Sequence, residues 1–205
     1  MEAPPSNKKY VLSLFEGITF FTASVFIAHF ASEYAEVRAS NSVDDIILSN
    51  IPVINFEIVF VQGAIALLLL VLALILRHPR TAPFVLKSSA LFIFIRSIFV
   101  SLTHIGPYPT HLDITSHLLD FITTGNDLFF SGHTGLPFLI ALIYWNHPII
   151  RNTFLIASVL FGVIVLLSHL HYSIDVFAAF FITYAIYHIS VTFFKKDLEF
   201  FRLSA

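Results

Sequence analysis

Three groups of polar residues in an otherwise apolar chain are of the types that act on phosphate esters. Residues 131–134 read Ser-Gly-His-Thr, and Ser131 can cap a helix whose first N–H groups would point towards an anion. His171 and Asp175 are four residues apart, so on a helix the carboxylate can fix the tautomer and raise the basicity of the imidazole. Arg96 adds a guanidinium. Such a set could hold a phosphate, attack it or activate a hydroxyl, and protonate a departing oxygen.

The composition places much of this chain in a lipid bilayer. Of its 205 residues, 57% are hydrophobic and 12% are charged, against roughly 45–50% and about 25% in soluble domains. The net charge of −2 gives no reason to expect a nucleic-acid partner, and the lack of cysteine excludes disulfides and thiolate metal sites. The apolar stretch after Lys8 and Lys9 is longer than a signal-peptide core of roughly 7–15 residues, so we expect it to remain as a first span.

Six apolar segments are candidates for spanning helices, which need about 20 residues each. The fourth is the shortest. The segments are residues 11–30, 58–76, 83–103, 131–145, 150–170 and 172–194. The prediction is an all-α fold, with residues 1–205 forming one membrane domain built as a bundle of six transmembrane helices.

The basic residues predict the orientation of this bundle. With six spans, nine of the Lys and Arg residues fall on one side of the membrane, and Arg38 alone falls in a loop on the other. The nine are Lys8, Lys9, Arg77, Arg80, Lys87, Arg151, Lys195, Lys196 and Arg202. Basic residues in short loops favour the cytoplasm. We therefore expect a multi-pass integral membrane protein with both termini cytoplasmic and acidic loops on the lumenal, exterior or periplasmic face.

This topology brings the three polar groups together. The fourth and sixth spans both begin at the non-cytoplasmic face, and the third span carries Arg96 towards it. A phosphate at this face would meet two positive helix ends, a guanidinium, and the imidazoles of His133 and His171. The predicted catalytic residues are His133, His171 and Asp175. This set needs no metal and no cofactor.

Further polar residues near this face are expected to bind substrate. The predicted substrate-binding residues are Arg96, Asp127, Ser131, Gly132, His104, His169 and Tyr172. Two alternatives stay open, because Arg96 could form a structural pair with a buried carboxylate and Asp127 could be a solvated loop residue. Loop histidines and aspartates could also ligate a metal, namely His104, His111, His117 and His169 with Asp113 and Asp120. Their spacing fits no standard zinc pattern.

Two of these segments resemble motifs of the sphingomyelin synthase family. Residues 125–134, GNDLFFSGHT, are similar to that family's C-G-D-x3-S-G-H-T motif. Residues 167–176, LSHLHYSIDV, resemble its second block, which centres on H-Y-[ST]-x-D-V. Arg96, followed by Gly106 and Pro107, is similar to a third and looser block. The resemblance implies six spans, membership of the wider type 2 phosphatidic acid phosphatase superfamily, and a triad at the three predicted catalytic residues.

The resemblance also implies an activity. It points to head-group transfer, in which phosphocholine or phosphoethanolamine passes from phosphatidylcholine or phosphatidylethanolamine to ceramide or diacylglycerol. The chain departs from both branches of the superfamily. Gly125 and Asn126 replace the Cys-Gly of the synthases, whereas Phe130 replaces a Pro and Ile164 and Val165 replace a Ser-Arg of the hydrolytic branch. The lost Arg argues against a simple lipid phosphatase. A phosphatase, a phospholipase C-like hydrolase and a non-enzymatic lipid-binding protein remain the alternatives.

Overall fold

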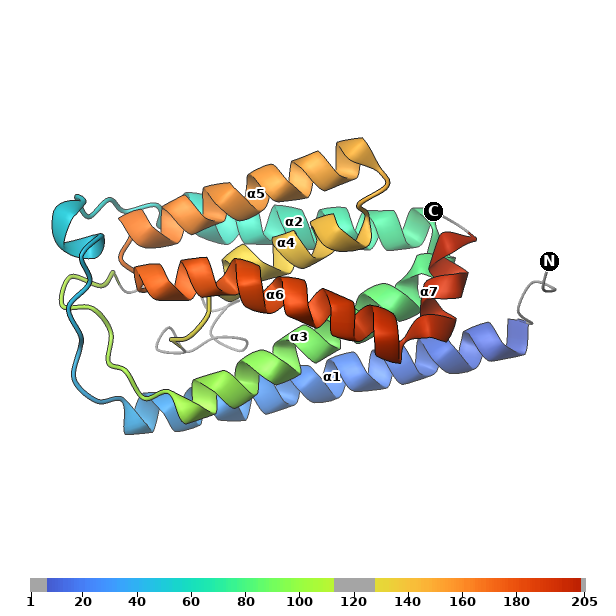
Figure 1. The fold of residues 1–205 in the computed structure, drawn as a ribbon, viewed down its shortest axis with the longest axis horizontal. Coiled ribbons are helices and arrows are strands. Elements are labelled where there is room, and N and C mark those ends of the chain that lie inside the picture. The colour runs from blue at the N-terminus through green and yellow to red at the C-terminus, as the bar shows by residue number, and fades with distance from the viewer. Residues whose placement is uncertain (1–6, 113–127, 204–205) are drawn as a thin grey trace.

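The computed structural model describes residues 7–112 and 128–203, and these form a bundle of helices (Figure 1). The helices are α1 (Asn7–Arg38), α2 (Glu57–Arg77), α3 (Ala82–Leu102), α4 (Gly132–Ile143), α5 (Pro148–Leu167), α6 (Ser173–Phe193) and α7 (Lys195–Arg202). Two short 3-10 turns, η1 (Leu48–Asn50) and η2 (Pro79–Thr81), lie in the connections. No β-strand occurs within the described ranges, so the all-α prediction is confirmed.

Five of these helices are long and apolar enough to cross a membrane, and α4 is a shorter apolar helix of 12 residues. The structure therefore has five to six helices able to span a bilayer, as predicted. The outer helices show large apolar side chains on their surfaces, and in α2 only Phe60 is buried. Such surfaces are suited to lipid. The sequence did not predict the eight-residue α7, which lies across the end of the bundle opposite the start of α6 (Figure 1).

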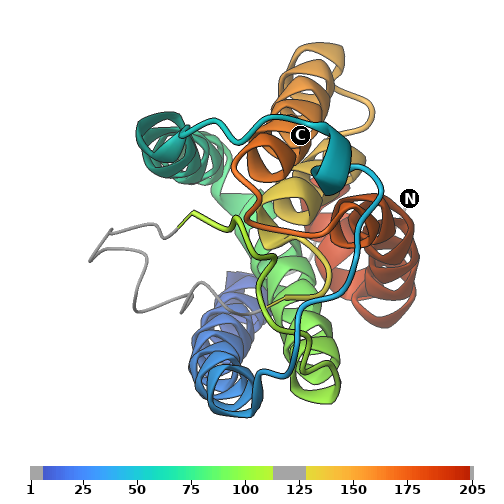
Figure 2. The same cartoon turned by 90° about the vertical axis from the view of Figure 1, so that its left-hand side faces the viewer.

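The short helix α4 lies at the centre of the bundle, between α3, α5 and α6 (Figure 2). Two features let its neighbours approach closely. A Cβ atom on Gly135 would lie 2.7 Å from the ring of Phe92 and 2.8 Å from Oγ1 of Thr183, so only glycine fits there. In addition, the Ser158 hydroxyl of α5 donates to the backbone carbonyl of Thr134, at 2.7 Å. The N-terminus of α4 is thus fixed against three other helices.

Two loops cross the end of the bundle at which α6 begins, residues 39–56 and residues 103–112 (Figure 2). They are fastened to each other, because the N–H of Ser40 donates to the carbonyl of His104 at 2.7 Å. The first loop is also fastened to the end of α5, since the N–H of Ile54 donates to the carbonyl of Leu167 at 2.8 Å. These backbone bonds hold both loops over the helix ends that carry the predicted catalytic residues.

Candidate active site

The N-termini of α4 and α6 are joined directly. The N–H of Ser131 donates to the backbone carbonyl of Asp175, with a distance of 3.1 Å. Ser131 is the N-cap of α4 and its hydroxyl accepts from the N–H of Thr134 at 3.4 Å, so the predicted cap is confirmed. Ser131 and Asp175 are both buried. The two positive helix ends that the topology placed on one side therefore lie side by side, which favours a bound anion.

His171 and Asp175 form the predicted contact across the first turn of α6. Nδ1 of His171 lies 3.3 Å from Oδ2 of Asp175, and the N–H of Tyr172 donates to the same oxygen at 3.1 Å. His171 is 7% exposed and Asp175 is 2% exposed. A carboxylate oxygen accepts hydrogen bonds, so a neutral imidazole that bonds to it carries its proton on Nδ1. This tautomer leaves a lone pair on Nε2, the atom that could attack phosphorus or take a proton.

Arg96 lies against the start of α4. Its Nε–H donates to the backbone carbonyl of Phe130 at 3.0 Å, and a Cβ atom on Gly132 would lie only 3.3 Å from the same nitrogen. The preceding residue, Phe129, has a φ of 104°, a conformation that costs energy for a residue with a side chain. Its ring is held against Phe99 of α3, with ring centroids 5.5 Å apart. Packing and the Arg96 hydrogen bond thus stabilise a strained turn beside the candidate site.

His133 is the second residue of α4, and its partly exposed ring packs against two phenylalanines that also contact each other. The ring centroid is 4.2 Å from that of Phe60 in α2 and 6.0 Å from that of Phe161 in α5, where the two planes are nearly parallel. Neither aromatic neighbour was among the predicted site residues. The two rings give His133 an apolar wall on one side, where electrostatic interactions are stronger than in open water.

His169, two residues before His171, is buried and adopts a left-handed backbone with a φ of 51°. Its Nδ1 lies 2.5 Å from the Thr110 hydroxyl, and its carbonyl oxygen lies 3.1 Å from Nδ1 of His111. Burial lowers the pKa of the His169 imidazole, against opposing effects of the Ile51 backbone and the Asp45 charge. The ring is therefore uncharged at neutral pH, and its Nδ1 can accept a hydrogen bond from the Thr110 hydroxyl.

The remaining predicted substrate-binding residues lie in different places. The Tyr172 hydroxyl donates to the carbonyl of Gly106 at 2.8 Å and accepts from the N–H of Val43 at 3.2 Å, so it fastens the two loops. The His104 ring contacts Tyr34 of α1, with ring centroids 5.4 Å apart, near the C-terminal ends of α1 and α3. Asp127 lies outside the described residues. Substrate binding by these three residues stays a prediction.

Asp45 also lies in this region, although nothing in the sequence around it indicates a role there. One of its carboxylate oxygens accepts from the N–H of Ser173 at 2.7 Å, and the other accepts from Ile47 and Leu48 at 2.8 and 3.1 Å. Burial alone would raise the pKa of Asp45, but these hydrogen bonds outweigh burial and lower it. Asp45 is therefore an ionised group at the start of α6.

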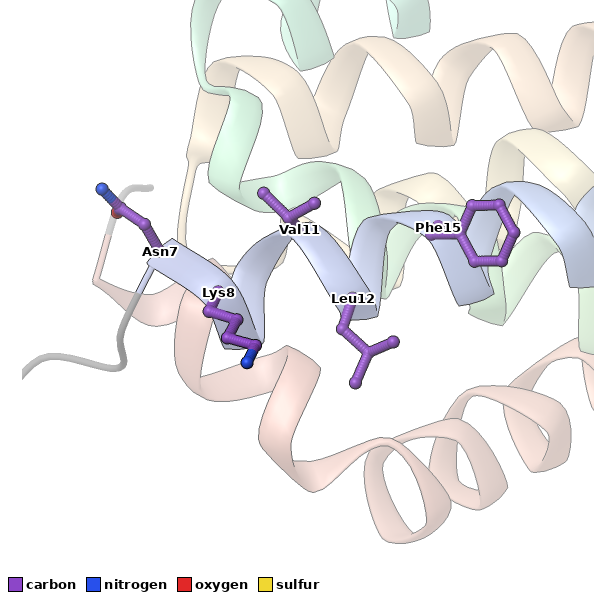
Figure 3. A pocket seen from close by; sticks show the side chains of 5 residues that line it. All are labelled: Asn7, Lys8, Val11, Leu12 and Phe15. Atoms are coloured by element: carbon purple, nitrogen blue, oxygen red, sulfur yellow. The ribbon is translucent and has the colours of Figure 1, made fainter.

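Within residues 7–112 and 128–203, no three His, Asp or Glu side chains converge as a metal site would require. His117, Asp113 and Asp120, which belong to the metal alternative, lie outside these ranges. A hollow on the outer surface of α1 is lined by one helix face only and offers no converging polar groups (Figure 3). It is lined by Asn7, Lys8, Val11, Leu12 and Phe15. The polar groups that do converge are those at the starts of α4 and α6.

One comparison with known proteins bears on this site. Residues 124–192, about a third of the chain, match the family model described as PAP2 superfamily C-terminal. The matched segment contains α4, α5 and nearly all of α6, and with them all three predicted catalytic residues. Neither a curated protein nor a solved structure matches the chain. The match supports the type 2 phosphatidic acid phosphatase superfamily, whose members generally catalyse phosphoryl transfer or hydrolysis, without distinguishing its branches.

Proposed function

We propose that this protein is a membrane phospholipid head-group transferase of the sphingomyelin synthase type. It moves phosphocholine or phosphoethanolamine from a glycerophospholipid to ceramide or diacylglycerol. The observation that carries the proposal is the joined pair of helix starts, in which Ser131 bonds to Asp175 and Asp175 holds His171. The superfamily match supports the phosphoester chemistry but not the identity of donor and acceptor.

The phosphate of the donor would lie at the two helix N-termini, near the Arg96 guanidinium. Arg96 is already oriented towards the start of α4 by its bond to Phe130. Helix N–H groups and a guanidinium both favour the negative charge that builds on the phosphoryl oxygens. His171 directly precedes α6 and Asp175 lies in its first turn, so the backbone bond from Ser131 to Asp175 also places the base beside the start of α4.

Two routes for the transfer use the same residues. In the covalent route, Nε2 of His171 forms a bond to phosphorus, the bond from phosphorus to the diacylglycerol oxygen breaks, and His133 protonates that oxygen. The acceptor hydroxyl then attacks phosphorus, loses its proton to His133, and displaces His171. In the direct route, His171 removes the proton of the acceptor hydroxyl as that oxygen attacks the donor phosphorus, while the bond from phosphorus to the diacylglycerol oxygen breaks and His133 protonates that oxygen. Asp175 stabilises the charge that His171 gains in both routes.

The surroundings of His133 favour transfer over hydrolysis. Phe60 and Phe161 pack together against the ring, so the residue that protonates the leaving group has an apolar wall on one side. An apolar wall beside the reacting groups favours a lipid hydroxyl over water as the acceptor. The sequence agrees, because the Ser-Arg of the hydrolytic branch is replaced by Ile164 and Val165.

The test is a transfer assay with purified protein in liposomes that contain fluorescent ceramide or diacylglycerol and either phosphatidylcholine or phosphatidylethanolamine. We expect a fluorescent phospholipid or phosphoceramide product that is absent with His171→Ala. The matched control is His188→Ala, which removes an exposed imidazole from the far half of the same helix. Release of free phosphocholine, phosphoethanolamine or phosphate without a lipid product would instead establish a hydrolase. Folded wild-type protein without either activity would contradict an enzymatic function.

A further inference from the structure

The start of α6 is held by a carboxylate from a distant part of the chain. Ser173 is the first residue of α6, and the first N–H groups of a helix have no partner within the helix. Oδ2 of Asp45, which is 128 residues away, accepts this N–H at 2.7 Å. Asp45 is 7% exposed. Its negative charge at the positive end of a helix adds to the stabilisation that the hydrogen bond gives.

The Asp45 side chain is also held by its own loop. Its other oxygen accepts the N–H groups of Ile47 and Leu48, so its side chain also holds the turn that leads into η1. With both oxygens in use, the carboxylate links a loop turn to a helix start. The neighbouring N–H, that of Tyr172, is held by Asp175. Two successive backbone N–H groups at the start of α6 are therefore held by two carboxylates, one of which also holds His171.

Further contacts tie the same loop to the connection between α5 and α6. The Ser168 hydroxyl donates to the carbonyl of Ile54 at 3.0 Å, and the Tyr172 hydroxyl accepts from the N–H of Val43 at 3.2 Å. His171 is in this connection, directly before the residues that Asp45 and Asp175 hold. The position of its imidazole relative to the start of α4 thus depends on a loop that contributes no catalytic group.

We propose that Asp45 is a positioning residue for the His171–Asp175 pair and that it acts through the Ser173 N–H. The proposal rests on the head-group transfer proposed above for the effect on rate, although the structural step does not depend on it. Without the Asp45 carboxylate, the first turn of α6 loses one of the two carboxylates that hold its N–H groups, and the His171 ring moves relative to the phosphate. A displacement of about 1 Å can cost roughly 100-fold in rate.

The experiment combines hydrogen exchange and kinetics on the full chain in liposomes. In Asp45→Ala we expect the Tyr172 and Ser173 amides to exchange faster, while amides in the middle of α6 keep their protection. We expect kcat to fall roughly tenfold to 100-fold with KM for the donor lipid unchanged. Asp45→Asn keeps an acceptor oxygen and should lie between Asp45→Ala and wild type in both measurements. Asp44→Asn removes a carboxylate from the exposed neighbouring position and should match wild type.

Unchanged exchange at Tyr172 and Ser173 in Asp45→Ala would overturn the inference, as would faster exchange with an unchanged kcat. An equal loss of protection over the whole of α6 would also overturn it, because Asp45 would then act on global folding. If Asp45→Ala does not fold, Asp45→Asn decides on the same criteria. Exchange needs no substrate, so wild-type protein that lacks transfer activity would contradict the proposed function while the Asp45–Ser173 link is still tested.

Discussion

The two ends of the bundle bury ionisable side chains in different ways. At the end where α4 and α6 begin, the carboxylates of Asp45 and Asp175 are held mainly by backbone N–H groups. At the opposite end, the buried Lys87 holds two carboxylates, since its ammonium lies 2.8 Å from the exposed Glu16 and 3.0 Å from the buried Asp197. At the first end, hydrogen bonds from the backbone stabilise the carboxylates. At the second end, a lysine ammonium stabilises them.

The cation cluster fastens α7 to the bundle. Lys87 of α3 is 5% exposed and Asp197 of α7 is 4% exposed. The three donors of the ammonium are directed at Glu16, Asp197 and the Ser13 hydroxyl, and Ser13 also contacts Asp197. An ammonium has only three donors, so none is left for a substrate. This cluster joins α1, α3 and α7 and is complete without a ligand.

The comparison shows that burial of a charged group in a membrane bundle does not by itself identify an active site. Lys87 and Arg96 are both basic residues of α3, and both lie within the predicted span 83–103, where an ionisable group is costly. Lys87 lies among carboxylates, whereas Arg96 lies at the start of a helix that offers further N–H groups to an anion. The arrangement of the neighbours, and the binding capacity that remains after pairing, distinguishes a structural cluster from a functional one.

The largest expected effect is the loss of transfer in His171→Ala and Asp175→Asn. Removal of a general acid–base or nucleophilic group lowers the rate by roughly 100-fold to 10,000-fold. Both variants should remain folded, because the bundle is held by other contacts, and product formation in liposomes measures the rate. A rate within about tenfold of wild type would exclude a direct chemical role for the pair.

The second effect distinguishes the structural end of the bundle from the proposed catalytic end. Lys87→Met should reduce the free energy of unfolding but should not change the transfer rate of the folded protein. The change leaves Asp197 buried without its cation, which costs roughly 3–5 kcal/mol in unfolding free energy. Thermal unfolding in detergent measures this loss, and activity per folded molecule should equal that of wild type. Lys87→Met combined with Asp197→Asn should recover part of the stability. Normal stability with lost activity would make the cluster functional and would remove the distinction.

A smaller effect is expected where Arg96 meets α4. The methyl group in Gly132→Ala would lie 3.3 Å from Nε of Arg96, so the guanidinium must move. We expect kcat to fall about tenfold, which corresponds to roughly 1.4 kcal/mol. Gly17→Ala is the matched control, since its Cβ would lie at an ordinary 3.4 Å from Leu86. Equal activity in the two variants would show that the position of Arg96 has little importance for the rate.

The sequence predicted those features of the site that depend on local spacing. The His171–Asp175 contact follows from a separation of four residues on a helix, and the Ser131 cap follows from its residue type and position. The joining of α4 and α6 was predicted more loosely, from the direction in which the spans run. Because successive spans cross the membrane in opposite directions, the sequence predicts on which face each helix begins. It does not predict which helix starts are in contact, and the 3.1 Å bond between Ser131 and Asp175 is seen only in the packed structure.

The features that sequence reasoning missed depend on contacts between distant residues. Asp45 was counted only as an acidic loop residue, because nothing in its neighbourhood indicates a partner 128 residues away. Phe60 and Phe161 looked like two of many lipid-facing aromatics, yet both pack against the His133 ring. The predicted fourth span was 131–145, whereas α4 ends at Ile143, and a helix this short is accommodated because its neighbours enclose it. Burial of this kind has no local signature in a chain that is apolar throughout.

The smallest expected effect concerns how the Asp45 cap depends on pH. The pKa of Asp45 in the folded protein lies below its ordinary value of 3.8, because its hydrogen bonds from the backbone outweigh burial. A carboxyl group with a lowered pKa contributes stability above its unfolded pKa, and this contribution is lost as the pH falls through the folded pKa.

The difference in melting temperature between wild type and Asp45→Asn should therefore be constant from pH 7 down to about pH 5, and should shrink only as the pH falls below 3.8. Other carboxylates titrate in the same range, so the difference between the two proteins is the quantity that isolates Asp45. Asp44→Asn, at the exposed neighbour, should show no such dependence. A difference that grows in acid would mean that protonated Asp45 holds Ser173 better than the ionised form. The start of α6 would then be held by hydrogen bonding alone, without a contribution from charge at the helix terminus.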